Sequence, residues 1–221
     1  MRFCRLIGLG LIAFLLSACG GPDQQDATEK AAEPAADAIS VSDAELAGNP
    51  FLEEWDTPYG VPPFDAIEDS HYMPAIKKAV LDLRTEIDAI VNNPEPPTFE
   101  NTIVALELSG DMLQKVAATF GNITGTDTND ELRALESQIY PMLTREFDAI
   151  TMNDDLWKRV KEVYDQRENL GLDEQDARLL ELRHRSFIRA GAALSPDVKQ
   201  QVADINAERK LELDRGAAKG R

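Results

Sequence analysis

Residues 76–90, IKKAVLDLRTEIDAI, carry a single apolar stripe in a strongly charged background. The stripe consists of Ile76, Val80, Leu83, Ile87 and Ile90. Spacings of three and four residues put these side chains on one face of an α-helix, which would bury that face against other helices. We expect Ser70 to cap this helix, with Pro74 in or near its first turn, and the prolines of NNPEPP (92–97) to end it.

Stripes of the same kind continue along the chain. Thr98 is the next N-cap candidate, and a long helix should follow it, with one face formed by Phe99, Ile103, Leu106, Leu113, Ala117 and Phe120. We expect GNITGTDT (121–128) to form a turn. Thr128 and Glu131 should then form a capping box at the start of another helix, which Pro141 should kink.

The remaining helices are marked by their end signals. Asn153 should cap a short amphipathic helix, and Asp173 should cap a longer one that Gly191 closes. Ser195 followed by Pro196 marks the start of a further helix. No run of alternating β-branched residues is long enough to predict a strand. We therefore predict an all-α domain of about six helices over residues 49–208.

An extended strap should precede these helices, in the stretch NPFLEEWDTPYGVPPF (49–64). Its prolines forbid a regular helix, while its aromatic and aliphatic side chains make it too apolar for a solvated loop. One interpretation is that the rings pack against the helical domain. The alternative is an aromatic platform that binds peptides.

Residues 1–18 have the plan of a signal peptide: Arg2 and Arg5 precede the apolar run 6–16, and small residues follow. That run is shorter than the roughly 20 residues that a membrane-spanning helix needs. Residues 16–19, LSAC, resemble the lipobox of bacterial lipoproteins, which implies cleavage before Cys19 and acylation of its thiol. The alternative is an ordinary signal peptide followed by a chance cysteine.

The residues after Cys19 predict a location and a spacer. Gly20, not Asp, follows the cysteine, and the resemblance to lipoproteins then favours an anchor in the outer membrane facing the periplasm. A free periplasmic protein is the alternative. Residues 19–48 hold few large apolar side chains, so we expect a disordered tether. Because Cys4 leaves with the signal peptide and Cys19 is acylated, the mature chain should offer no free thiol.

Charge and motifs exclude several classes of function. The chain has 40 acidic and 23 basic residues, a net charge of -17, which argues against a nucleic-acid partner. It contains no Gly-rich phosphate loop, GxSxG, CxxC or HExxH motif. His71 and His184 could hold zinc only if the fold brought both to one carboxylate. We expect His71 instead to pack or cap at a helix start and His184 to lie on a solvated face, so no catalytic or metal-binding residue is assigned.

Five long stretches of the sequence are similar to one family. They are NPFLEEWDTPYGVPPFDAIEDSHYMPAI, IDAIVNNPEPPTFENTIVALELSG, DTNDELRAL, VYDQRENLGLDEQDARLLE and FIRAGAALSPDVKQQVADINAE. In order and spacing they resemble the start of the mature part of bacterial peptidyl-dipeptidases, in the M3 (thimet oligopeptidase-like) family of zinc peptidases. The resemblance covers Asn49 to Glu208.

The resemblance implies a nearly all-helical protein whose N-terminal helices form one wall of a deep channel for short unfolded peptides. Enzymes of this branch release dipeptides from the peptide C-terminus, using one zinc ion and an HExxH motif. No position of this chain matches a zinc ligand of the family. The chain as written should therefore be catalytically incomplete, and should act on short peptides only when joined to a catalytic part.

The last residues suggest a cause for this incompleteness. Val198, Val202 and Ile205 make an apolar stripe, but the tail RKLELDRGAAKGR (209–221) continues it with charged and small residues. We expect an aberrant tail, produced by a frameshift or a premature stop near Glu208. The alternative is a stand-alone, lipid-tethered helical module that binds peptides or a protein partner without cleaving them.

Overall fold

The computed structural model describes residues 39–195, 197–198 and 201. Every regular element among these residues is helical, so the all-α prediction is confirmed. The longer helices are α2 (Asp69–Val91), α4 (Asp111–Thr126), α5 (Asp130–Thr151), α6 (Asp154–Asp165) and α7 (Glu174–Ala190). No helix in the described part of the chain is both long and apolar enough to cross a membrane.

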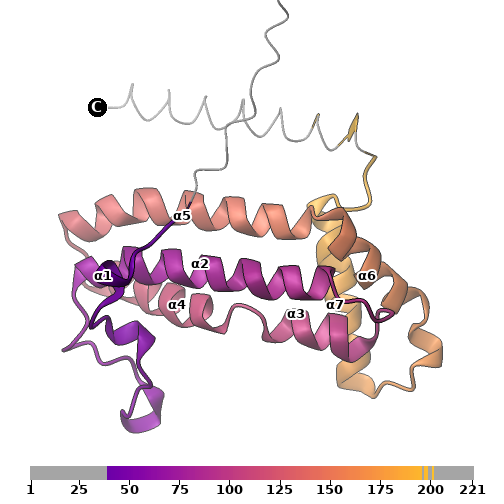
Figure 1. Cartoon of the computed structure of the whole chain (residues 1–221), viewed down its shortest axis with the longest axis horizontal. Helices are drawn as coiled ribbons and strands as arrows, with labels where there is room; N and C mark the ends of the chain where they lie inside the picture. Colours follow the sequence, from indigo (N-terminus) through magenta and orange to yellow (C-terminus); the bar gives the residue numbers. More distant parts are fainter. Residues whose placement is uncertain (1–38, 196, 199–200, 202–221) are drawn as a thin grey trace, which may run out of the picture. The chain divides into compact units, whose positions relative to one another are not determined.

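Helix α2 lies at the centre of the domain, between α4 and α5 (Figure 1). All members of the predicted stripe, from Ile76 to Ile90, are at most 5% exposed. Tyr72, Ala75 and Ala79 widen the buried face toward the start of the helix. Complete burial of an aliphatic side chain of this size contributes about 1.5–3 kcal/mol. This one face therefore supplies a large part of the hydrophobic stabilisation.

The start of α2 differs from the prediction in its capping residue. Glu68, not Ser70, is the N-cap, so the helix starts two residues earlier and Pro74 lies well inside it. The backbone N–H of Glu68 donates a hydrogen bond to Nδ1 of His71 at 3.0 Å. The expectation that His71 packs or caps at a helix start is confirmed.

The prediction of a single long helix from Phe99 to Phe120 is wrong. This stretch is divided into a π-helical turn (Phe99–Val104), α3 (Ala105–Leu108) and α4, with a break between α3 and α4. At the break, Gly110 has φ = 80°, a left-handed conformation that glycine adopts without a steric penalty. A Cβ atom at this position would also lie 3.3 Å from Cδ1 of Leu83 on α2. The break therefore depends on glycine for both backbone conformation and packing.

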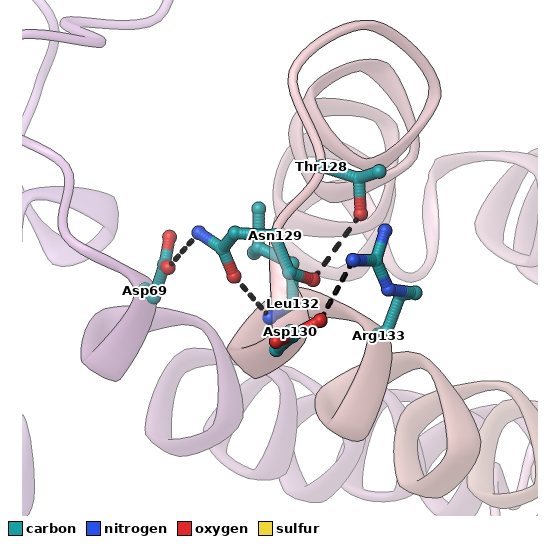
Figure 2. A network of polar contacts seen from close by, with 6 residues as sticks. All are labelled: Asp69, Thr128, Asn129, Asp130, Leu132 and Arg133. Carbon is teal, nitrogen blue, oxygen red and sulfur yellow. Dashed lines mark hydrogen bonds and ion pairs between the residues drawn. The ribbon is translucent and has the colours of Figure 1, made fainter.

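The connection between α4 and α5 also differs from the prediction. Most of the stretch 121–128 is the last part of α4, not a turn. Asn129, not Thr128, caps α5: its Oδ1 accepts from the backbone N–H of Leu132 at 2.8 Å. Nδ2 of Asn129 also donates to the carboxylate of Asp69 at 2.6 Å, as Figure 2 shows. This amide joins the starts of α5 and α2, a contact between remote residues that the sequence does not reveal.

Helices α6 and α7 begin at the predicted caps. The side chain of Asn153 caps α6 and that of Asp173 caps α7. Helix α7 ends at Gly191, where φ is 94°. The two helices pack through stacked rings, with the centroid of Trp157 6.1 Å from that of Phe187.

The structured domain begins earlier than its composition predicts. Residues 39–48, assigned to the tether, contain the one-turn helix α1 (Asp43–Leu46). Ser42 caps the start of this helix in a capping box. Ile39 packs against the core. Residues 39–48 of the expected tether are therefore part of the described structure, where the capping box at Ser42 and the contact of Ile39 with the core hold them.

Candidate functional site

A groove of about 520 Å³ opens between α2, α7, the end of α5 and the junction of α3 with α4. Its apolar lining includes Leu83, Ile87, Leu113, Phe147, Ile150 and Phe187. The volume lies in the range of sites that bind small molecules. Phe147 is 52% exposed, so the groove offers apolar surface that the domain itself leaves uncovered.

The groove lies at the break between α3 and α4, and Ser109 and Gly110 are part of its lining. The backbone N–H of Gly110 donates to the carboxylate of Glu86 on α2 at 2.7 Å. Had the two helices continued as one, this N–H would have been used within the helix. The contact with Glu86 therefore fixes the break against α2 and with it one side of the groove.

An ion pair between Arg183 of α7 and Glu107 of α3 contributes to the lining. Nε of Arg183 donates to Oε2 of Glu107 at 2.7 Å, and a second guanidinium nitrogen contacts the same oxygen. Both side chains are more than a third exposed, so the pair contributes little to stability. It does place one positive and one negative group beside an apolar surface.

The serine hydroxyls and the charged groups that line the groove are held by neighbouring groups. Its serine hydroxyls are already engaged: Ser109 donates to the carbonyl of Leu106 at 2.8 Å, and Ser186 to that of Arg183 at 2.7 Å. The lining contains no histidine or cysteine to activate a nucleophile. Its two charged groups, Arg183 and Glu107, bind each other.

The two candidate histidines lie on different helices and make structural contacts. The prediction that His184 lies on a solvated face is wrong. Its ring stacks on that of Tyr164, with the centroids 3.7 Å and the planes 5° apart. The ring of Trp157 is 5.1 Å away. Burial lowers the pKa of His184, and the charge of Asp165 opposes this shift. Among the described residues no group of three His, Cys, Asp or Glu side chains could hold a metal ion, so these residues do not fit zinc.

Comparisons with known proteins identify the family, although no family profile matches the chain. The chain is 42% identical over 160 residues to dipeptidyl carboxypeptidase of Escherichia coli, covering 72% of this chain and 24% of that protein. The Salmonella typhimurium protein of that name is 40% identical over 163 residues, with 74% and 24% covered. Oligopeptidase A of Escherichia coli is 27% identical over 165 residues, with 75% and 24% covered.

Over this segment the chain belongs to the M3 peptidase family. The resemblance seen in the sequence is thereby confirmed. The chain spans about a quarter of the length of the curated relatives it matches. Cys19, the expected lipid-attachment residue, lies outside the described residues, as do Pro196 and the tail 209–221.

Lys115 of α4 helps to hold the strap of this M3 segment in place. Its ammonium group donates to the carbonyls of Phe51 and Glu53 at 3.2 and 3.0 Å. It also lies 4.0 Å from the centre of the Trp55 ring, a cation–π contact, and burial lowers its pKa. Phe51 is 2% exposed. The interpretation that the strap's rings pack against the domain is correct for Phe51 and Trp55.

The tip of the strap does not pack in this way. Tyr59, Val61 and Phe64 are all exposed, and Tyr59 is fully so. The strap thus has an anchored half and a half whose apolar side chains face outward. Neither of the two interpretations offered by the sequence describes the whole strap.

A residue that sequence reasoning missed is Arg159 of α6, which is only 9% exposed. Its guanidinium donates to the carbonyls of Asn93 and Glu95 at 3.1 and 3.3 Å and to Oδ1 of Asn101 at 3.2 Å. It therefore fixes the loop after α2 and the π-helical turn of this M3 segment against α6. Arg159 falls on the apolar stripe of α6 three residues after Leu156, which was the available signal.

Proposed function

We propose that this chain forms the substrate-channel wall of a lipid-anchored M3 zinc peptidase that releases dipeptides from the C-terminus of short peptides. The observation that carries the proposal is the 42% identity with a dipeptidyl carboxypeptidase. Identity with oligopeptidase A is only 27% over a segment of similar length. This difference favours the dipeptide-releasing branch of the family.

The catalytic zinc of such a peptidase would be held by residues other than 39–195, 197–198 and 201 of this chain. His71 caps α2, and His184 stacks between rings on α6, so neither imidazole is placed for a shared ion. An HExxH-bearing catalytic part, on the same or on another polypeptide, would supply the zinc chemistry. The present segment would supply rigid helices and surface for peptide binding.

The groove beside α7 gives this wall its binding surface. A short peptide in extended form could place one apolar side chain against Phe147 and Leu113, because both line the groove. Arg183 and Glu107 offer charges of both signs at the same place. Such a surface would bind peptides with little demand on their sequence, which suits a channel that admits many short peptides.

The lipid anchor belongs to the same proposal and has its own test. A triacylated Cys19 would hold the domain at the outer membrane, because more than one acyl chain gives stable binding to a bilayer. Cells expressing the chain should incorporate labelled palmitate into it and retain it in the outer-membrane fraction. Cys19→Ser should abolish both results, and unchanged fractionation of that variant would contradict the anchor.

The activity is tested on the gene product purified from its own cells in detergent. Zinc content and release of dipeptides from a peptide with a blocked N-terminus are measured together, with and without a chelator. We expect zinc-dependent release of the C-terminal dipeptide. Sequencing the DNA downstream of the codon for Asn206 in all frames would show whether an HExxH motif follows. A preparation without zinc or release, from a locus that encodes no HExxH motif, would refute the proposal.

The second candidate function is a lipid-tethered helical module that binds peptides or a protein without cleaving them. It is favoured by the groove, which has the size of a binding site and lacks catalytic groups. Calorimetric titration with short apolar peptides separates the two candidates when combined with the assay above. Binding without cleavage by the gene product would favour the module.

A further inference from the structure

The tip of the strap, residues 57–64, presents three apolar side chains that the domain does not cover. Tyr59 is 103% exposed, Val61 49% and Phe64 46%. Single exposed apolar residues are common on protein surfaces, but clusters of them mark contact sites. Here the three lie within six residues of one another on one short segment.

The tip is held in one conformation by its own hydrogen bonds. The hydroxyl of Thr57 donates to the carbonyl of Val61 at 2.5 Å, and the backbone N–H of Gly60 donates to the carbonyl of Thr57 at 3.0 Å. The N–H of Phe64 donates to the carbonyl of Pro62 at 2.8 Å. Because these bonds and the surrounding prolines fix the backbone, docking of the tip would cost little conformational entropy.

The backbone is also strained where the most exposed ring is attached. Tyr59 has φ = 61° and is the one non-glycine residue with positive φ among the described residues. Strain of this kind persists when the surroundings enforce it, and it clusters at functional sites. The strained conformation holds the ring of Tyr59 away from the domain, where it makes no contact that would stabilise the isolated chain.

The charge around the tip defines the partner it can accept. Exposed carboxylates flank the tip on both sides in the sequence. Glu53, Glu54 and Asp56 precede it, and Asp65 and Glu68 follow it. The nearby base Lys115 is already bound to the strap. Five carboxylates repel anionic lipid headgroups and acidic proteins, and they favour a surface with basic residues at its edge.

We propose that the tip docks in an apolar pocket with a basic rim on the catalytic part of the peptidase. This inference rests on the proposed function. The chain spans only 24% of the length of its dipeptidyl carboxypeptidase relatives, so a complete enzyme of this family has three times as much chain to provide that pocket. The ring of Tyr59 would enter the apolar pocket, and the flanking carboxylates would contact the basic residues at its rim.

The experiment is photo-crosslinking in the native cell, with benzoylphenylalanine placed at position 59 of the full chain. Position 138 on α5 is the matched control, because Gln138 is also exposed and lies on another element. We expect position 59 to crosslink to peptides of an HExxH-containing polypeptide, or of an HExxH-containing continuation of this chain. The yield from position 138 should be about tenfold lower, as expected for a site outside the contact.

A second variant tests the charge of the pocket. Asp56→Lys combined with Asp65→Lys should reduce the crosslink from position 59 by about tenfold, because both changes place positive charge against a basic rim. An unchanged yield would refute the basic rim. Crosslinks to lipid alone, crosslinks to a protein without HExxH, or equal yields from positions 59 and 138 would each overturn the docking proposal.

The outcome for docking can be separated from the outcome for catalysis in the same preparation. Zinc-dependent dipeptide release without a crosslink from position 59 refutes docking and leaves the peptidase proposal intact. A crosslink to the HExxH polypeptide without dipeptide release supports docking and refutes the proposed activity. Absence of both refutes both.

Discussion

Several charged side chains of this domain are partly or fully buried and make two or more polar contacts each. Glu146 of α5 is nearly buried and accepts two hydrogen bonds from Arg84 of α2, at 2.8 and 2.5 Å. Arg159 and Lys115 instead hold backbone carbonyls that no helix or strand satisfies. The other ion pairs of the described residues are exposed and contribute little.

The pair of Arg84 and Glu146 gives a prediction on stability. Glu146→Gln keeps the shape but removes the charge and one acceptor, and it leaves the guanidinium of Arg84 without its counter-ion. We expect the free energy of unfolding to fall by about 1–2 kcal/mol, measured by urea denaturation. Glu181→Gln removes a carboxylate from an exposed pair on α7 and should change stability by less than about 0.5 kcal/mol. Equal effects of the two variants would contradict this ranking.

The strain at Tyr59 gives a prediction of the opposite sign. Tyr59→Gly should raise the free energy of unfolding by up to about 1 kcal/mol, because glycine adopts φ = 61° without the clash of a Cβ atom. Tyr59→Ala removes the same ring but keeps the Cβ atom, so it should leave stability almost unchanged. Urea denaturation of both variants separates strain from loss of the ring. If alanine stabilised as much as glycine, strain would not be the cause.

Among the elements, the helix ends and the break at Gly110 decide how the helices are arranged. Thr98 caps the π-helical turn as predicted, with its hydroxyl accepting from the N–H of Asn101 at 3.0 Å. Pro141 lies within α5 without ending it. Between α3 and α4, however, the helix is interrupted at Gly110, which has the left-handed backbone conformation that glycine favours. This break, at Ser109 and Gly110, forms part of the lining of the groove.

Two glycine substitutions test the break. Gly110→Ala should lower the free energy of unfolding by about 1–2 kcal/mol, because φ is 80° and the added Cβ would lie 3.3 Å from Leu83. Gly125→Ala is the control, since Gly125 lies within α4 with open space around its Cβ position. That change should stabilise by up to about 1 kcal/mol. Thermal or urea denaturation gives both values, and a stabilising Gly110→Ala would show that the break does not require glycine.

The packing of α6 on α7 should depend on pH through His184. Burial against Tyr164 and Trp157 lowers its folded-state pKa below the ordinary value of 6.5. As pH falls, His184 is therefore protonated in the unfolded chain before it is protonated in the folded chain. The neutral, buried imidazole contributes fully to the free energy of unfolding above pH 6.5, and this contribution is lost as pH falls below that value. The difference in unfolding free energy between the native chain and His184→Gln should shrink from neutral to mildly acidic pH. A constant difference would mean that the stack tolerates an imidazolium.

For the whole molecule, the dominant electrostatic fact is an excess of 17 negative charges. Exposed carboxylates are spread over the strap and the outer faces of the helices, while the buried face of α2 is apolar. Such an excess keeps a protein soluble but opposes its compact state through self-repulsion. The hydrophobic core has to outweigh this repulsion at every pH above the isoelectric point.

The repulsion predicts how salt acts on stability. At neutral pH, raising NaCl to about 0.5 M should increase the melting temperature, because it shortens the screening length to a few ångströms. Near the isoelectric point of about 4.5 the same addition should have a much smaller effect, since net repulsion is then small. Calorimetry over a salt series at the two pH values gives the slopes. A melting temperature that fell with salt at neutral pH would mean that attractive pairs outweigh the repulsion.

The helical class, the buried stripe from Ile76 to Ile90, several caps and the family can be predicted from sequence, because each rests on local spacing or on matching stretches of residues. The capping of α5 by Asn129 and not by Thr128 became visible only in the folded domain, where Asp69 of α2 also holds the Asn129 amide. The same holds for the break at Gly110, which faces Leu83 on α2, and for the burial of Arg159. These features depend on partners remote in the chain, and helical periodicity records only that a face is buried, not which side chain lies opposite it.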